Sequence, residues 1–120
     1  MITNKATVPT WNSGASESRE SMHIYHIVLP KIWEEFKDTE FYTAESLKAE
    51  GFIHCSFAEQ LDTVLERYYR DAGDVVVLTI ETDTLTSRLV TEPSTNQEIY
   101  PHIYGAINRN AIVGIAEKEV

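Results

Sequence analysis

The sequence has one cysteine and lacks any long apolar run. Cys55 alone cannot form an internal disulfide, and no succession of charged, apolar and small residues marks a signal peptide. The longest purely apolar stretch, residues 75–78, is far too short to cross a bilayer. These absences predict a cytoplasmic protein that does not enter a membrane.

Basic residues are also scarce. The chain has 10 Lys and Arg against 19 Asp and Glu, a net charge of −9, and no cluster of Lys or Arg. Such a surface repels nucleic-acid backbones and anionic membranes, so we expect no DNA, RNA or membrane partner. A small phosphate-bearing ligand held by backbone N–H groups stays open, although the five glycines form no phosphate-binding loop. The oligomeric state is not indicated.

The chain divides into a leader and a body. Residues 1–21 show no apolar periodicity and predict a disordered leader. Residues 22–120 predict a single globular domain that buries roughly two thirds of its unfolded surface. Helical patterns occupy its first half and β-branched runs its second, which favours an α+β fold with a mainly antiparallel sheet and two or three helices. Strands are predicted at 23–29, 52–55, 75–81, 88–92, 99–105 and 111–117. Helices are predicted from Pro30 to about Lys37, over 43–50 with Thr43 as a candidate cap and Gly51 as the stop, and from Ser56 to a stop at 71–73.

The stretch 51–60 is the most informative. Ser56 followed by Glu59 resembles a capping box, which predicts that a helix of about four turns begins at Ser56. His54 and Ser56 alternate on a strand and share one face. Cys55 then points to the opposite face and is interpreted as a buried apolar residue.

A second stretch, 99–105, repeats this arrangement. Tyr100, His102 and Tyr104 share one face of the predicted strand, and we expect this face to meet that of His54. The alternatives are structural: His54 as a core histidine bonded to a carbonyl, Ser56 as a helix cap only, and the tyrosines as packing on an exposed sheet.

A metal site is not supported. His26, His54, His102 and Glu92 are suitable zinc ligands, but their spacing matches no zinc motif, so no metal and no required cofactor are predicted.

Two segments identify a family. Residues 50–56, Glu-Gly-Phe-Ile-His-Cys-Ser, and 101–105, Pro-His-Ile-Tyr-Gly, resemble the signatures of domain-of-unknown-function family 952, and the similarity extends from Met22 to about Val113. The resemblance implies a fold similar to that of the ADP-ribosyltransferases, with a split, strongly bent sheet and a cleft for a nicotinamide dinucleotide. Fold alone does not establish activity.

The resemblance also implies residue roles. His54 would hold a ribose, Tyr104 or Tyr42 would stack on a ring, and Glu92 would polarise a hydroxyl of the reacting ribose. The predicted catalytic residues are therefore His54, His102 and Glu92, and the predicted ligand-binding residues are Ser56, Tyr42, Tyr104 and Gln60.

Two functional hypotheses follow. The first is an enzyme, a transferase or glycohydrolase that acts at a ribose of NAD or a related nucleotide. The second is a module that binds a nucleotide or small anion without chemistry, which the lack of a recognisable catalytic triad favours.

Overall fold

A computed structural model describes residues 22–120, and the predicted leader lies outside the described residues. The α-helices are α1 (Pro30–Glu34), α2 (Glu45–Glu50) and α3 (Leu61–Tyr68). The strands are β1 (His23–Val28), β2 (Phe41–Tyr42), β3 (Ile53–His54), β4 (Asp74–Glu81), β5 (Arg88–Pro93), β6 (Ile99–Tyr104), β7 (Ile107–Asn108) and β8 (Ile112–Glu119). Short 3₁₀ turns lie at Ala58–Gln60, Thr95–Gln97 and Arg109–Ala111. The α+β prediction is confirmed for this part of the chain.

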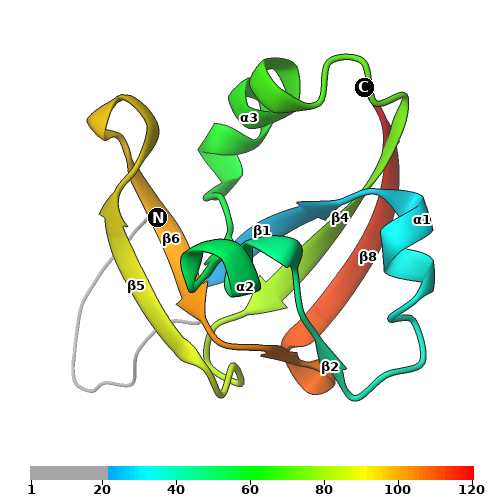
Figure 1. The fold of residues 1–120 in the computed structure, drawn as a ribbon, viewed down its shortest axis with the longest axis vertical. Helices are drawn as coiled ribbons and strands as arrows, with labels where there is room; N and C mark the ends of the chain where they lie inside the picture. The colour runs from blue at the N-terminus through cyan, green and yellow to red at the C-terminus, as the bar shows by residue number, and fades with distance from the viewer. Residues whose placement is uncertain (1–21) are drawn as a thin grey trace.

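The strands form three small antiparallel sheets rather than one. Their orders are β1-β4-β8, β2-β7 and β3-β6-β5. Figure 1 shows β4 between β1 and β8, and β5 beside β6. The sequence pattern located six of the strands, but β2 and β7 are only two residues long and carry no alternation to detect.

Strand β4 is the centre of the largest sheet and is buried on both faces, as its β-branched run predicts. Val76, Leu78 and Ile80 face the main core, which also contains Tyr42 and residues of the other two sheets. Val75 and Val77 alternate with them and pack with Ile27 and Leu65, so that α3 covers the other face.

The start of the third helix differs from the prediction. Ser56 is not a cap: its N–H donates to the Tyr25 carbonyl and its carbonyl accepts from the Tyr25 N–H, at 2.8 and 2.9 Å, in an isolated β-bridge. The side-chain amide oxygen of Gln60 instead accepts from the Phe57 N–H at 2.9 Å, and the helical segment begins at Ala58. The bridge to β1 therefore displaces the cap by one residue, and α3 ends at Tyr68, before the predicted stop at 71–73.

Helix α2 ends as its sequence predicts. Gly51 follows it with a φ of 93°, the left-handed conformation that favours glycine. Its N-cap is Ala44 rather than Thr43. None of the helices in residues 22–120 has the length and apolar character needed to span a membrane.

Candidate functional site

The two histidines of the signature segments lie side by side. His54 of β3 and His102 of β6 are directly opposite in the antiparallel pair, and their ring centroids are 5.4 Å apart at an interplanar angle of 82°. Directly opposite residues project from the same side of a sheet, so the two polar faces meet as expected.

These two histidines differ in exposure. The His54 side chain is 48% exposed, and its Nε2 lies 3.2 and 3.3 Å from the carboxylate oxygens of Glu50. The His102 side chain is 3% exposed, and its Nε2 is buried without a hydrogen-bond partner. His54 is thus the histidine that solvent reaches.

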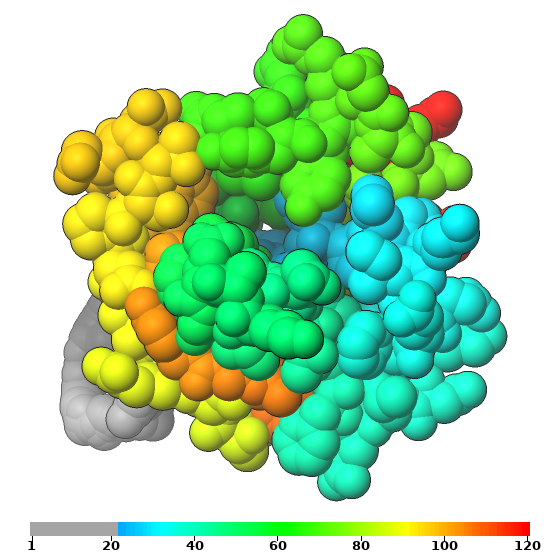
Figure 2. Space-filling model, in the orientation of Figure 1, coloured from blue at the N-terminus to red at the C-terminus, as the bar shows by residue number. Residues whose placement is uncertain are grey.

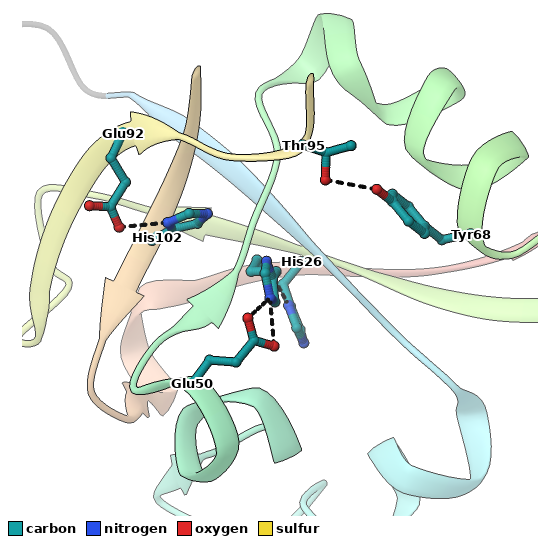
Figure 3. Close-up of polar contacts among 7 residues, drawn as sticks. His26, Glu50, Tyr68, Glu92, Thr95 and His102 are labelled. Carbon is teal, nitrogen blue, oxygen red and sulfur yellow. Dashed lines mark hydrogen bonds and ion pairs between the residues drawn. The ribbon is translucent and has the colours of Figure 1, made fainter. Parts of the chain in front are cut away.

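Glu92, on β5, is bonded to His102 and Tyr104. Its Oε2 accepts from Nδ1 of His102 at 2.7 Å and from the Tyr104 hydroxyl at 2.5 Å, and Figure 3 shows the contact with His102. These two bonds, that of Tyr104 first, hold the pKa of the Glu92 carboxyl below its usual range. The same bond raises the pKa of the Tyr104 hydroxyl. Glu92 is therefore ionised at neutral pH.

Sequence reasoning missed Phe52 and Arg88. The Phe52 ring stacks on His102 with centroids 4.1 Å apart and an angle of 19°, and also contacts the rings of His54 and Tyr104. The Arg88 guanidinium lies 5.8 Å from the centroid of Tyr104. Phe52 belongs to the first signature segment and could have been identified from it. No sequence pattern pointed to Arg88. We call the side chains of Phe52, His54, Glu92, His102 and Tyr104 the histidine face.

A cleft of about 1250 Å³ adjoins the histidine face. Figure 2 shows it as a hollow between α2 and α3, and β1 also contributes to its walls. Its lining includes three predicted site residues, Tyr42, His54 and Ser56, whereas Gln60, Glu92, His102 and Tyr104 do not line it. His54 is the predicted residue that the cleft and the histidine face share.

Tyr68 and Thr95 join two walls of this cleft. The hydroxyl oxygens of Tyr68, on α3, and Thr95, in the turn between β5 and β6, are 2.9 Å apart, as Figure 3 shows. This bond ties α3 to the β5–β6 hairpin.

Tyr42 is paired with His26 in the lining of the cleft. The His54 carbonyl can only accept, so Nδ1 of His26 donates to it at 2.7 Å, and Nε2 accepts from the Tyr42 hydroxyl at 2.8 Å. Burial lowers the pKa of His26 to about 4 and raises the pKa of Tyr42. His26 is thus a neutral, fully bonded core histidine that connects β1 to β2 and β3.

Two other predicted ligand-binding residues have structural partners. The Gln60 amide nitrogen donates to Glu98 Oε2 at 3.0 Å and to the Ile99 carbonyl at 2.8 Å, which fastens the start of α3 to β6. The Ser56 N–H is already bonded to the Tyr25 carbonyl. This N–H is therefore not free for a phosphate.

Cys55 is buried, and burial raises the pKa of its thiol, which fits the predicted apolar role. Within residues 22–120, no three His, Cys, Asp or Glu side chains are grouped so that they could hold a metal ion.

Comparisons with known proteins place this geometry in a family. The model of the family described as "Protein of unknown function (DUF952)" matches residues 27–115. The chain belongs to this family. No curated protein matches the chain.

Two solved structures of protein CC0527 from Caulobacter crescentus are similar to the chain. The solution NMR structure is 25% identical, covers 82% of this chain and 85% of that protein, and gives a TM-score of 0.71. The crystal structure is 26% identical, covers 81% and 84%, and gives a TM-score of 0.69. The DUF952 fold described above is therefore shared with an experimentally determined structure.

Proposed function

We propose that this DUF952 protein is an enzyme that acts at a ribose of NAD or a related nucleotide, by ADP-ribosyl transfer or hydrolysis. The observation that carries the proposal is the Glu92 carboxylate. Two hydrogen bonds fix its Oε2, its pKa is lowered, and its Oε1 has no hydrogen-bond partner among the described residues. An ionised, oriented carboxylate stabilises the positive charge that develops on a sugar ring when its glycosidic bond breaks, and its free oxygen can accept from a ribose hydroxyl.

The neighbouring side chains suit the same ligand. Tyr104 is 37% exposed as a residue and presents an aromatic ring beside the carboxylate. His54 is accessible from both the histidine face and the cleft, where it would hold the ribose. Arg88, beside Tyr104, and Lys48, in the cleft lining, are the nearby cations for phosphate groups.

The proposal includes an ADP-ribosyltransferase-like fold. The family resemblance implies this fold. The three small antiparallel sheets and the cleft beside them support the assignment. Superposition on an ADP-ribosyltransferase tests it: the assignment needs Glu92 and His54 to fall on that enzyme's nucleotide-contacting residues.

The activity is tested by incubating the protein with NAD and with ADP-ribose derivatives and analysing the products by mass spectrometry. We expect release of nicotinamide or transfer of ADP-ribose by the wild type and its loss in Glu92→Gln. The matched control is Glu81→Gln, because Glu81 also pairs with a histidine, His23, at 3.1 Å but lies outside the histidine face. No product from any substrate, or equal activity in Glu92→Gln and the wild type, contradicts the proposal.

A second candidate is a module that binds a nucleotide or small anion without turnover. The observation that favours it is that Glu92 and His102 do not line the cleft, so a ligand held there need not contact the carboxylate. Calorimetric titration with the same nucleotides separates the two functions, since binding without product formation supports the module.

A further inference from the structure

His102 Nε2 is the one buried side-chain nitrogen or oxygen in residues 22–120 that has no hydrogen-bond partner. Buried polar groups in proteins are nearly always bonded, because an unmade bond costs the full desolvation of the group. The other ring nitrogen of His102, Nδ1, is bonded to Glu92 Oε2 at 2.7 Å. The orphan atom therefore calls for a partner that the chain itself does not supply.

The bond to Glu92 decides what that partner must be. A carboxylate accepts, so the proton of this bond resides on Nδ1 of His102. In the neutral imidazole, Nε2 is then left with its lone pair and acts as an acceptor. The missing partner is a donor, such as a hydroxyl group.

Phe52 covers one face of the ring that carries this atom. Its ring stacks on the His102 ring with centroids 4.1 Å apart and also contacts His54 and Tyr104. Phe52 itself is only half-buried, and it lies in the irregular segment between α2 and β3.

The segment that carries Phe52 has room to move. Gly51 precedes it with a φ of 93°, and a Cβ atom built at Gly51 would meet nothing within 4 Å. Helix α2, which leads into Gly51, contains no buried residue. Leu47 of α2 packs against the main core, so the displacement considered is a rotation of the Phe52 side chain, which breaks its own ring contacts.

We infer that the Phe52 ring fills a ligand subsite over the face of the His102 ring in the unliganded chain, and that a ligand that displaces it places a hydroxyl at the edge of this ring, where it donates a hydrogen bond to Nε2. This inference rests on the proposed function and deepens it, since it names the group that the site recognises as a hydroxyl of the nucleotide's ribose. Glu92 then holds the opposite side of the imidazole in the required tautomer.

The test uses Phe52→Ala and two small probes. Methyl ribofuranoside has the ribose hydroxyls, and its fully O-methylated derivative has the same ring without a donor. The nitrogen NMR signal of His102 Nε2 reports a new hydrogen bond directly. We expect methyl ribofuranoside to shift this signal in Phe52→Ala at a concentration roughly tenfold lower than in the wild type, and the O-methylated probe to leave it unchanged.

Phe41→Ala is the control, because Phe41 is a 48% exposed phenylalanine on β2, outside the histidine face, and this variant should behave as the wild type. Phe52→Leu replaces Phe52→Ala if the alanine variant fails to fold, since leucine keeps apolar cover but cannot stack. Carbethoxylation, a modification of accessible imidazole nitrogens, gives a second measurement. We expect His102 to react roughly tenfold faster in the Phe52 variant, with His54 as the internal reference.

Three results would overturn the inference: an Nε2 signal that does not move in the Phe52 variant, equal shifts with both probes, or equal carbethoxylation of His102 in the variant and the wild type. The probes contain no nicotinamide, so their outcome is independent of turnover. A shifted Nε2 signal without NAD turnover retains the subsite and removes the proposed function, and turnover without the shift does the reverse.

Discussion

His26 and His102 are both buried histidines, with exposed fractions of 6% and 2%, but their surroundings differ in one respect. Both ring nitrogens of His26 are bonded, to the His54 carbonyl and the Tyr42 hydroxyl. Only Nδ1 of His102 is bonded, to Glu92. The difference separates a histidine that serves the fold from one whose bonding is incomplete without a ligand, and burial alone does not distinguish them.

Substitution by leucine is expected to give the largest contrast between the two positions. His26→Leu leaves the Tyr42 hydroxyl and the His54 carbonyl without their partner, which should lower the free energy of unfolding by about 3 kcal/mol. His102→Leu removes one bond but also the unpaired Nε2, so a loss of about 1 kcal/mol is expected. Urea unfolding of the two variants measures the contrast, and equal losses would contradict it.

The pH dependence of stability sharpens the comparison further. Burial lowers the pKa of folded His26 from 6.5 to about 4, so the unfolded chain binds the proton more readily between these values. The contribution of neutral His26 is complete above pH 6.5 and is lost as the pH falls toward 4, a difference of about 3 kcal/mol. Urea unfolding at several pH values should show this fall in the wild type and a flatter profile in His26→Leu. Parallel profiles would show that other groups cause it.

The smallest effect is expected at Tyr104. Its hydrogen bond to Glu92 raises the pKa of the hydroxyl, so Glu92→Gln should let Tyr104 ionise at a lower pH. Absorbance of the phenolate during titration follows this change, and subtracting the titration of Tyr104→Phe identifies the Tyr104 signal. An unchanged titration in Glu92→Gln would mean that the Glu92 bond is not maintained in solution.

The sequence predicted most of the longer elements because each carries its own signal. The β-branched run of β4, the proline at the start of α1 and the glycine after α2 all act locally. The sequence also predicted that His54 and His102 lie together, because strand alternation determines which side chains of each strand share a face. The predicted helix cap at Ser56 was wrong because Ser56 forms a bridge to Tyr25, which is distant in the chain and cannot be detected from a capping pattern.

Burial and tertiary bonding were the parts of the site that the sequence did not reveal. A strand pattern treats His54 and His102 alike, yet Phe52 covers only one of them closely. The partnership of Glu92 with Tyr104 and His102 depends on the register of β5 against β6, which no local signal determines. Gln60 likewise became structural through contacts with β6.

The arrangement of the sheets has a consequence for the order of folding. Glu92, His102 and Tyr104 all belong to the β5–β6 hairpin, whose innermost pair joins Pro93 to Ile99. The pairs β1–β4 and β3–β6 join segments far apart in the chain, such as His23 with Glu81 and Ile53 with Ile103. Local contacts cost less loop-closure entropy and form sooner, so we expect the hairpin to form first and His54 to dock on it later. The carboxylate and its imidazole would then be in place before the cleft beside them exists.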